Sequence, residues 1–265
     1  MRIVLIGAGR LASHLAPALR QAGHDIVQVY SRTITSARSL SEQVGAQPTD
    51  DVQQVQTDAD VFIFSVTDTA LPMLIAQLGV ESRRKALFLH TAGSVPLSVF
   101  EGYAQRYGVI YPMQTFSKGR QVDFSKIPVF VEGNNEETLK EVSLLAASVS
   151  AEVTELSTEG RRHLHLAAVF ACNFANHCYQ LSAEILSHYG LPFRLMLPLI
   201  DETAAKVHEL QPLEAQTGPA VRYDENVLNA QKQLLAADPL RADLYDLMSR
   251  SIHQSHMLSS ELQNF

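Results

Sequence analysis

The sequence predicts an α/β protein in which an N-terminal Rossmann dinucleotide-binding domain precedes an all-α C-terminal domain. Three observations predict this fold class. A glycine-rich turn at residues 7–12 follows the first apolar run, and short β-branched runs alternate with helical stretches up to about residue 157. Only long helical patterns follow that point. The expected domains are therefore residues 1–157 and residues 158–265.

Length, composition and charge agree with two folded domains and exclude some partners. The chain has 265 residues, 46% of them hydrophobic, and a formal net charge of −7. The negative charge argues against a general binder of nucleic acid or of an anionic membrane. Apolar runs such as Leu166–Cys172 are far shorter than the roughly 20 residues of a transmembrane helix. Cys172 and Cys178 are spaced to face different sides of a helix, which argues against a disulfide and favours a cytoplasmic protein.

Strands are expected where short β-branched and aromatic runs are bounded by Gly, Pro, Asp or Asn. These runs are Arg2–Ile6, Ile26–Tyr30, Val61–Ser65, Ala86–His90, Val109–Ile110, Pro128–Val131 and Glu152–Glu155. Helical periodicity between them predicts helices at Leu11–Ala22, Ser36–Val44, Leu71–Leu78 and Glu136–Val149. This alternation is typical of a parallel sheet with helical crossovers.

The second half predicts helices alone. Their expected ranges are Glu159–Tyr189, Pro192–Glu209, Asp224–Ala236 and Pro239–Leu262. Proline is favoured in the first turn of a helix, which suits both Pro192 and Pro239. The segment Gln211–Tyr223 carries two prolines and a glycine, and we expect it to be an ordered loop.

The turn after the first strand has the residue order that a pyrophosphate site requires. It reads Gly7-Ala8-Gly9-Arg10-Leu11-Ala12. The first glycine permits a tight turn, the second lets the backbone approach the pyrophosphate, and the small sixth residue lets the helix pack on the strand. The amides at the helix N-terminus then face the anion. An ordinary glycine-rich turn is the alternative interpretation.

The residues after the second strand favour NADP(H) over NAD(H). An NAD site has a carboxylate there, which accepts a hydrogen bond from the ribose 2′-hydroxyl. This strand is instead followed by Ser31, Arg32 and Thr33. A guanidinium between two hydroxyls suits a 2′-phosphate. Alternatively, Arg32 is only a solvated charge.

Ser65, Val66 and Thr67 follow another core strand at its carboxyl end, where ligands of open α/β sheets bind. We expect them to contact the nicotinamide ribose. Asp68 comes next and is equally suited to cap the following helix.

Substrate chemistry is expected at the ends of the next two strands and on the first long helix. Hydride transfer to a carbonyl or imine needs a proton donor and hydrogen bonds to the acceptor atom. The strand-end candidates are His90, Tyr111, Gln114 and Thr115. On the helix, Asn173 and His177 lie one turn apart on the face that also carries His165, and His177 is our preferred general acid. Turn, packing and interhelical hydrogen-bonding roles are the alternatives, and the histidine spacings predict no metal site.

Five motifs together resemble a known family. They are GAGRLA, HTAGS, YPMQTFS, HLAAVFACNFANH and AQTGPAVRYD, in that order along nearly the whole chain. The chain resembles Rossmann-like bacterial NADP- or deazaflavin-dependent oxidoreductases that carry a helical C-terminal domain of unknown function. The resemblance implies an NADP(H) cofactor and a helical domain similar to the C-terminal domain of 6-phosphogluconate dehydrogenase.

The order of domains is also similar, more distantly, to that of ketopantoate reductase, pyrroline-5-carboxylate reductase and the β-hydroxyacid dehydrogenases. Ala92-Gly93-Ser94 and Pro112-Met113-Gln114-Thr115 resemble two loops that flank the nicotinamide in pyrroline-5-carboxylate reductases, with Met and Pro exchanged and Gln in place of Asn. The β-hydroxyacid dehydrogenases use a Lys-x-x-x-Asn helix. Here Val169 stands four residues before Asn173, so their acid–base mechanism does not transfer.

These observations predict an NADP(H)-dependent reductase for a small carbonyl or imine substrate bound between the two domains. The resemblance implies a homodimer formed through the helical domain, with the loop Ala215–Pro219 near the site of its own or a partner subunit. Two alternatives stay open. One is an NADP(H)-binding regulator or sensor without chemistry, and the other is a deazaflavin:NADP oxidoreductase.

Overall fold

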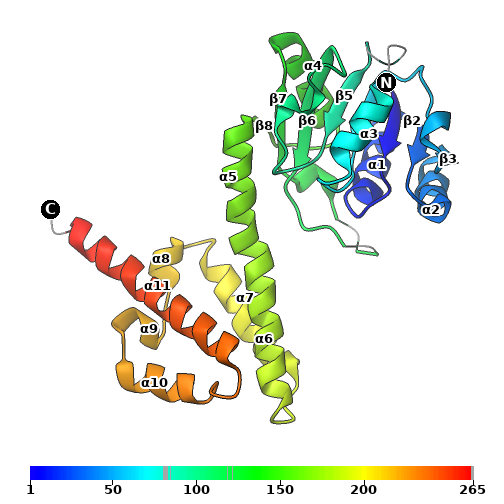
Figure 1. Ribbon diagram of the computed structural model, residues 1–265. Coiled ribbons are helices and arrows are strands. Elements are labelled where there is room, and N and C mark those ends of the chain that lie inside the picture. Colours follow the sequence, from blue (N-terminus) through cyan, green and yellow to red (C-terminus); the bar gives the residue numbers. More distant parts are fainter. Residues whose placement is uncertain (80–82, 84, 118, 121, 264–265) are drawn as a thin grey trace. The chain divides into compact units, whose positions relative to one another are not determined.

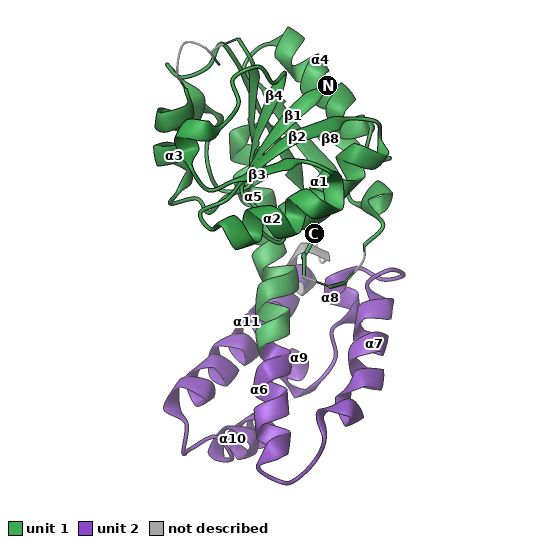
Figure 2. Ribbon diagram, turned by 90° about the vertical axis from the view of Figure 1, so that its right-hand side faces the viewer, with its two compact units in different colours: residues 1–177 green, residues 178–265 purple. Residues whose placement is uncertain are grey.

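The computed structural model describes residues 1–79, 83, 85–117, 119–120 and 122–263. The chain divides into two compact units, Met1–His177 and Cys178–Phe265, which Figure 2 shows in different colours. The domain boundary that the sequence predicts near residue 157 lies before this division, between the last strand and the first long helix. It stays a prediction about domain organisation.

The first unit contains an eight-stranded sheet in the order β3-β2-β1-β4-β5-β6-β7-β8 (Figure 1). The strands are β1 (Arg2–Ile6), β2 (Asp25–Tyr30), β3 (Gln47–Thr49), β4 (Val61–Phe64), β5 (Leu87–His90), β6 (Arg106–Pro112), β7 (Val129–Gly133) and β8 (Val153–Glu155). The helices between them are α1 (Ala12–Gln21), α2 (Ile34–Val44), α3 (Leu71–Leu78) and α4 (Glu136–Ala147). This is the Rossmann-like arrangement that the sequence predicts.

Two apolar layers cover the two faces of the sheet. Alternate residues of β1 and β5 point to opposite sides: Ile3 and Leu5 pack with α1 and α4, while Val4 and Phe88 pack with α3. The central strand β4 is buried at all four positions, as parallel strands covered on both faces are. The sheet edge at the carboxyl ends of β1, β2 and β4 to β6 is therefore a rigid platform.

Two features of the sheet differ from the predicted alternation. Strand β7 runs antiparallel to β6, because the described residues of the connection between them form only a short 3₁₀ turn at Phe124–Lys126 and no crossover helix. Strand β3 was not expected, since its sequence is Gln-Pro-Thr. It lies at the edge of the sheet, where a proline costs no ladder hydrogen bond.

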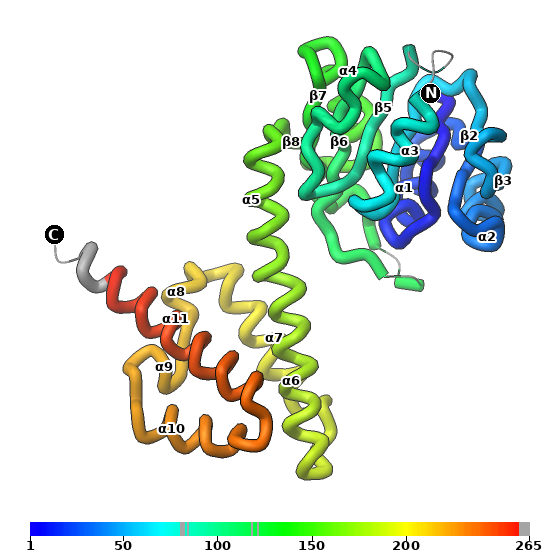
Figure 3. The backbone as a smooth tube through the Cα atoms, viewed as in Figure 1, coloured from blue at the N-terminus to red at the C-terminus, as the bar shows by residue number. Residues whose placement is uncertain are grey.

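The predicted helix at Glu159–Tyr189 contains a change of helix type. It consists of α5 (Thr158–Ala168), a π-helical segment (Val169–Phe174) and α6 (Ala175–Ser187). Figure 3 shows the backbone running without a break from α5 into α6. A π-helical turn has i→i+5 hydrogen bonds and is often found at functional sites.

The second unit is helical. After α6 it contains α7 (Leu197–Lys206), α8 (Pro212–Ala215), α9 (Pro219–Arg222), α10 (Glu225–Gln233) and α11 (Pro239–Gln263). The predicted ordered loop at Gln211–Tyr223 holds the two one-turn helices α8 and α9, each with a proline in its first turn. No helix in the described part of the chain is both long enough and apolar enough to cross a membrane.

Candidate functional site

The turn between β1 and α1 adopts a backbone that its first position can reach only with glycine. Gly7 has a φ of 113°, and its amide donates a hydrogen bond to the Tyr30 carbonyl oxygen at 2.8 Å. A Cβ added at Gly7 would lie 2.1 Å from the Ser65 carbonyl oxygen. The turn is thus pressed against the end of β4, at the switch point of the sheet where ligands of such folds bind.

The N-terminus of α1 is open to an anion. Its cap residue Leu11 makes no side-chain hydrogen bond to the first helical amides, and Ala12 is fully buried against the sheet. A Cβ added at Gly9 would approach the Ser65 carbonyl oxygen only to 3.9 Å, so the turn leaves room beside its backbone. Uncapped amides and an approachable glycine backbone are what a pyrophosphate needs, and the residues fit a dinucleotide.

The residues after β2 lie beside this turn, because β1 pairs with both β2 and β4. Arg32 is exposed, and Thr33 begins α2 with its hydroxyl donating to Ser36 Oγ at 2.9 Å. Residues 31–36 contain no carboxylate. An exposed guanidinium with neighbouring hydroxyls fits a ribose 2′-phosphate better than a 2′-hydroxyl.

The segment Ser65–Thr67 closes the turn from the β4 side. The Ser65 amide donates to the Ile6 carbonyl oxygen at 2.8 Å, which holds the two strand ends together. Asp68 does not cap α3, since the cap residue is Ala70. Its carboxylate instead accepts a hydrogen bond from the Ser94 hydroxyl, which ties the loop after β4 to the loop after β5.

A cavity of about 470 Å³ lies within the first unit, beyond the carboxyl end of β6. One wall comes from the end of β6 and the loop after it, and the other comes from α5 and the π-helical segment. The lining residues are Tyr111, Met113, Gln114, Thr115, Leu164, His165, Ala167, Ala168, Val169, Ala171, Cys172 and Asn173. Four of the six predicted catalytic residues, Tyr111, Gln114, Thr115 and Asn173, are brought together here.

A tyrosine–histidine pair is the reactive feature of this cavity. The Tyr111 hydroxyl lies 3.0 Å from His165 Nδ1, and the two rings meet edge to face at 6.1 Å. Burial raises the pKa of Tyr111, and the positive charge of Arg161 opposes that shift. Tyr111 is therefore a neutral phenol that can donate a proton, and the imidazole beside it can return one.

The position of His165 is set by the loop after β5. A Cβ added at Gly93 would lie 2.7 Å from both Cγ and Nδ1 of His165, so the imidazole packs directly on the glycine. Any side chain at this position would push the ring away from Tyr111. The sequence singled out Ala92-Gly93-Ser94 as a loop near the nicotinamide, and its packing partner is the imidazole.

Arg161 holds the same loop from the start of α5. Its side chain is 1% exposed and forms an ion pair of 2.7 Å with Glu132 on β7. Arg161 Nε donates to the Ala92 carbonyl oxygen at 3.2 Å, and Nη2 donates to the Val95 carbonyl oxygen at 2.5 Å. Burial lowers the pKa of Arg161, and the carboxylate of Glu132 offsets part of that effect.

Sequence reasoning missed both Arg161 and the role of His165. The available signal was their spacing: a cation and an imidazole four residues apart on one helix share a face. Glu132 also accepts hydrogen bonds from the amide and hydroxyl of Thr158, at 2.8 and 2.9 Å. The first turn of α5 is thereby attached to β7 and to the loop after β5 at once.

His90 does not reach the cavity. It is fully buried, its Nδ1 accepts a hydrogen bond from the Ala92 amide at 3.1 Å, and its ring lies 5.6 Å from that of Phe100. Burial lowers the pKa of His90 to about 3, the charge of Arg161 acts in the same direction, and the backbone of Pro96 opposes the shift. A neutral imidazole in this position shapes the loop.

His177 does not line the cavity either. Its side chain is exposed, while Asn173, four residues earlier, is part of the wall. The expectation that both share one face assumed a uniform α-helix, with about 100° between successive residues. The π-helical segment adds a residue to its turn and rotates the next residues of the helix away from that face.

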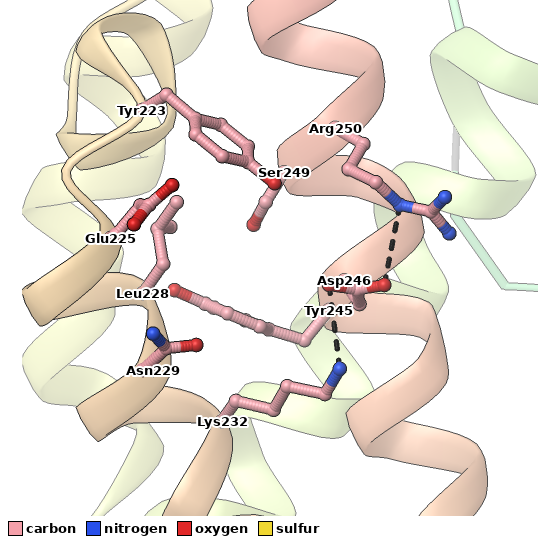
Figure 4. Close-up of a pocket in the computed structure, with 9 residues that line it drawn as sticks. All are labelled: Tyr223, Glu225, Leu228, Asn229, Lys232, Tyr245, Asp246, Ser249 and Arg250. Atoms are coloured by element: carbon pink, nitrogen blue, oxygen red, sulfur yellow. Dashed lines mark ion pairs between the residues drawn. The ribbon is translucent and has the colours of Figure 1, made fainter.

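A second cavity of about 250 Å³ lies in the helical unit, between α9, α10 and α11 (Figure 4). Tyr223, at the end of α9, has a φ of 52° and is the one described non-glycine residue with a positive φ. The cations Lys232 and Arg250 are each paired with Asp246, at 3.4 and 3.2 Å. With its cations neutralised and no proton donor paired with a base on its wall, this cavity is a weaker candidate for chemistry.

Comparisons with known proteins agree with this geometry. The family described as "NADP oxidoreductase coenzyme F420-dependent" matches residues 2–92, and a domain of unknown function, DUF2520, matches residues 127–252. A crystal structure from Bacteroides fragilis, provisionally named an NADP oxidoreductase, is 53% identical, with a TM-score of 0.91 over 96% of this chain and 98% of that one. No curated protein matches the chain.

More distant solved structures share the fold. An imine reductase from Myxococcus stipitatus in complex with NADP⁺ has 17% identity and a TM-score of 0.67, covering 96% of this chain and 94% of that one. A pyrroline-5-carboxylate reductase from Coxiella burnetii has 17% identity and a TM-score of 0.58, covering 96% and 97%. The chain therefore belongs to the NADP oxidoreductase family, in which the NADP-binding domain is followed by DUF2520 and NADP is the cofactor.

Proposed function

We propose that the protein is an NADP(H)-dependent reductase that transfers hydride to the carbonyl or imine carbon of a small molecule held in the 470 Å³ cavity. The observation that carries the proposal is the Tyr111–His165 pair on the cavity wall. When bound, the nicotinamide would supply the hydride. Reduction also needs one proton at the substrate oxygen or nitrogen, and a buried phenol paired with an imidazole can supply it.

The residues of the chain divide this work. Tyr111 donates its hydroxyl proton to the substrate heteroatom, and the imidazole of His165 relays a proton to the phenolate, giving one from Nδ1 as Nε2 takes one up from solvent. Gln114, Thr115 and Asn173 line the same cavity and position the substrate by hydrogen bonds. The proposal therefore moves the proton-donor role from His177 to Tyr111. The cavity walls come from both sides of residue 157, in agreement with a substrate held between the two predicted domains.

The cofactor would occupy the carboxyl edge of the sheet. The residues that fit it are Gly7, Ala8, Gly9, Arg10, Leu11 and Ala12 for the pyrophosphate, Ser31, Arg32 and Thr33 for the 2′-phosphate, and Ser65, Val66 and Thr67 for the nicotinamide ribose. The loop after β5, on which His165 packs, leaves the sheet next to these residues. This placement follows from the strand order, since all these segments leave the sheet at the same edge.

NADPH oxidation by the purified protein tests this proposal against its two rivals. The panel contains cyclic imines, oxo acids and a deazaflavin, followed by the change in NADPH absorbance. Reduction of imines or carbonyls supports the reductase. Turnover of the deazaflavin alone would assign the coenzyme exchange that the family description names. NADPH binding without turnover of any compound would assign a sensor.

The Tyr111→Phe variant tests the proton donor. We expect turnover to fall roughly 100- to 10,000-fold, the range for losing a general acid, while NADPH affinity is unchanged. Tyr103→Phe is the matched control, because Tyr103 is 37% exposed and does not line the cavity. Equal turnover in the two variants would remove Tyr111 from the mechanism.

We also propose that the protein is a cytoplasmic homodimer formed through the helical unit. Large apolar side chains are exposed there, among them Leu199 at 64%, Leu240 at 71% and Leu247 at 56%. Burial of these side chains against a second copy of the chain would remove apolar surface from water. Light scattering on the purified protein gives the oligomeric state, and a monomeric mass at micromolar concentration would contradict the dimer.

A further inference from the structure

The cavity that holds Tyr111 and His165 has walls without fixed charge. None of its twelve lining residues is Lys, Arg, Asp or Glu. The wall formed by α5 and the π-helical segment is mostly apolar, with Leu164, Ala167, Ala168, Val169 and Ala171. The other wall supplies a hydroxyl from Tyr111 and neutral polar groups from Gln114 and Thr115. The described lining can hydrogen-bond a reacting atom, but it holds no permanently charged side chain.

Arg161 is close to this site and is already committed to other partners. Its guanidinium is 1% exposed, forms the ion pair with Glu132, and donates to two backbone carbonyls in the loop after β5. Turning it towards a ligand would break these contacts and leave the Glu132 carboxylate, which is 16% exposed, without its cation. A partly buried charge that loses its partner is strongly unfavourable. Arg161 is therefore unavailable as an anchor for a substrate carboxylate.

A negatively charged substrate would meet no lysine or arginine on the described wall of this cavity. Burial of an unpaired carboxylate is costly, whereas an apolar body gains free energy from every apolar contact. The cavity volume of about 470 Å³ lies within the range of ordinary small-molecule sites.

We infer that the substrate is an uncharged carbonyl or imine compound with an apolar body, and that the site discriminates against carboxylate-bearing imines and oxo acids. This inference rests on the proposed reductase function and narrows its substrate class. It separates the protein from the carboxylate substrate for which the pyrroline-5-carboxylate reductases are named.

A matched substrate pair tests the inference. The cyclic imine 1-pyrroline and its 5-carboxylate have the same ring and the same reacting bond, and they differ in one charge. We expect kcat/KM with NADPH to be at least roughly tenfold higher for 1-pyrroline, since each factor of ten corresponds to about 1.4 kcal/mol. An equal or higher value for the carboxylate would overturn the inference and leave the reductase function intact.

A charge introduced into the wall should reverse the preference. Val169→Lys places an ammonium on the apolar wall of the cavity and is expected to raise kcat/KM for the carboxylate relative to 1-pyrroline. Leu166→Lys is the matched control, because Leu166 lies on the same helix, is 55% exposed and does not line the cavity. The same change of preference in both variants would mean that the cavity wall is not what discriminates.

Alkylation of the two cysteines tests anion exclusion without turnover. Cys172 lines the cavity and Cys178 does not. Neutral iodoacetamide and anionic iodoacetate differ little in size. Mass spectrometry of the peptides that contain Cys172 and Cys178 gives the alkylation rate of each cysteine with each reagent. We expect the iodoacetate-to-iodoacetamide ratio at Cys172 to be several-fold below that at Cys178, and to rise in Val169→Lys. Equal ratios in the native protein would overturn the inference. If no imine or carbonyl compound is reduced, the reductase proposal fails, and these ratios still decide whether the cavity rejects anions.

Discussion

Replacement of His90 by Asn should change how the stability of the protein depends on pH. His90 is fully buried at the end of β5, with a pKa of about 3 instead of 6.5. An unfolded chain therefore binds a proton at this residue below about pH 6.5, and the folded chain does not until about pH 3. Folding is opposed by that proton uptake throughout the interval, so the His90 contribution lowers stability as pH falls.

The two pKa values determine the size of the effect. At pH 7 the unfolded imidazole is mostly neutral and the contribution is near zero. At pH 5 it costs the folded state about 2 kcal/mol, from a difference of about 1.4 kcal/mol for each pH unit below 6.5. Asn at position 90 cannot titrate, and its carbonyl oxygen can accept the hydrogen bond that Ala92 now donates to Nδ1.

Urea unfolding followed by circular dichroism at pH 7, 6 and 5 measures this difference. The native protein should lose about 2 kcal/mol more than His90→Asn between pH 7 and pH 5, whatever the absolute stability of the variant. The half-buried His24, whose pKa is also lowered by burial, contributes to both proteins and cancels. Parallel pH profiles would refute the assignment of His90 as a buried neutral imidazole.

Three further substitutions test the site. Arg161→Met should lower the free energy of unfolding by about 3–5 kcal/mol, because it leaves Glu132 unpaired. Arg106→Met breaks a more exposed pair with Glu141 and should cost about 1 kcal/mol. Equal losses in urea titrations of the two variants would contradict the buried network. Gly93→Ala should displace the His165 ring and lower turnover roughly 100-fold with NADPH affinity retained, and unaltered turnover would show that the ring position is unimportant. Arg32→Ala should weaken NADPH binding roughly tenfold or more in fluorescence titrations and leave NADH binding unchanged, and a retained NADPH affinity would remove Arg32 from the 2′-phosphate site.

The nucleotide-binding half of the fold could be predicted because its signals are local. A strand, a glycine turn and a helix in immediate succession define the Gly7–Ala12 turn without knowledge of any distant contact. The strands β1, β2, β4 and β5 are short apolar runs with clear ends, whereas β6 runs from Arg106 to Pro112, beyond the predicted Val109–Ile110. Edge strand β3 and the reversal at β7 escaped prediction, since both depend on which neighbour a strand finds in the sheet.

The candidate site was predicted only in part, for a different reason. Tyr111, Gln114, Thr115 and Asn173 were found by their position at strand ends or on the polar face of a helix. Arg161 was missed because a buried cation is recognised by its partner, and Glu132 is 29 residues away in the sequence. His177 was preferred because a uniform α-helix places it one turn from Asn173 on the same face, and no residue pattern announced the change of helix type at Val169–Phe174.

The π-helical segment Val169–Phe174 allows the chain to differ by one residue in length at this point without turning α6. Deletion of one residue would allow the segment to close as an ordinary α-helix. A π-helical turn of about five residues covers nearly the same rotation as an α-helical turn of about four, so the side chains of α6 would keep their azimuth relative to α5. Sequences related to this chain can therefore gain or lose one residue here and still present the same face of α6.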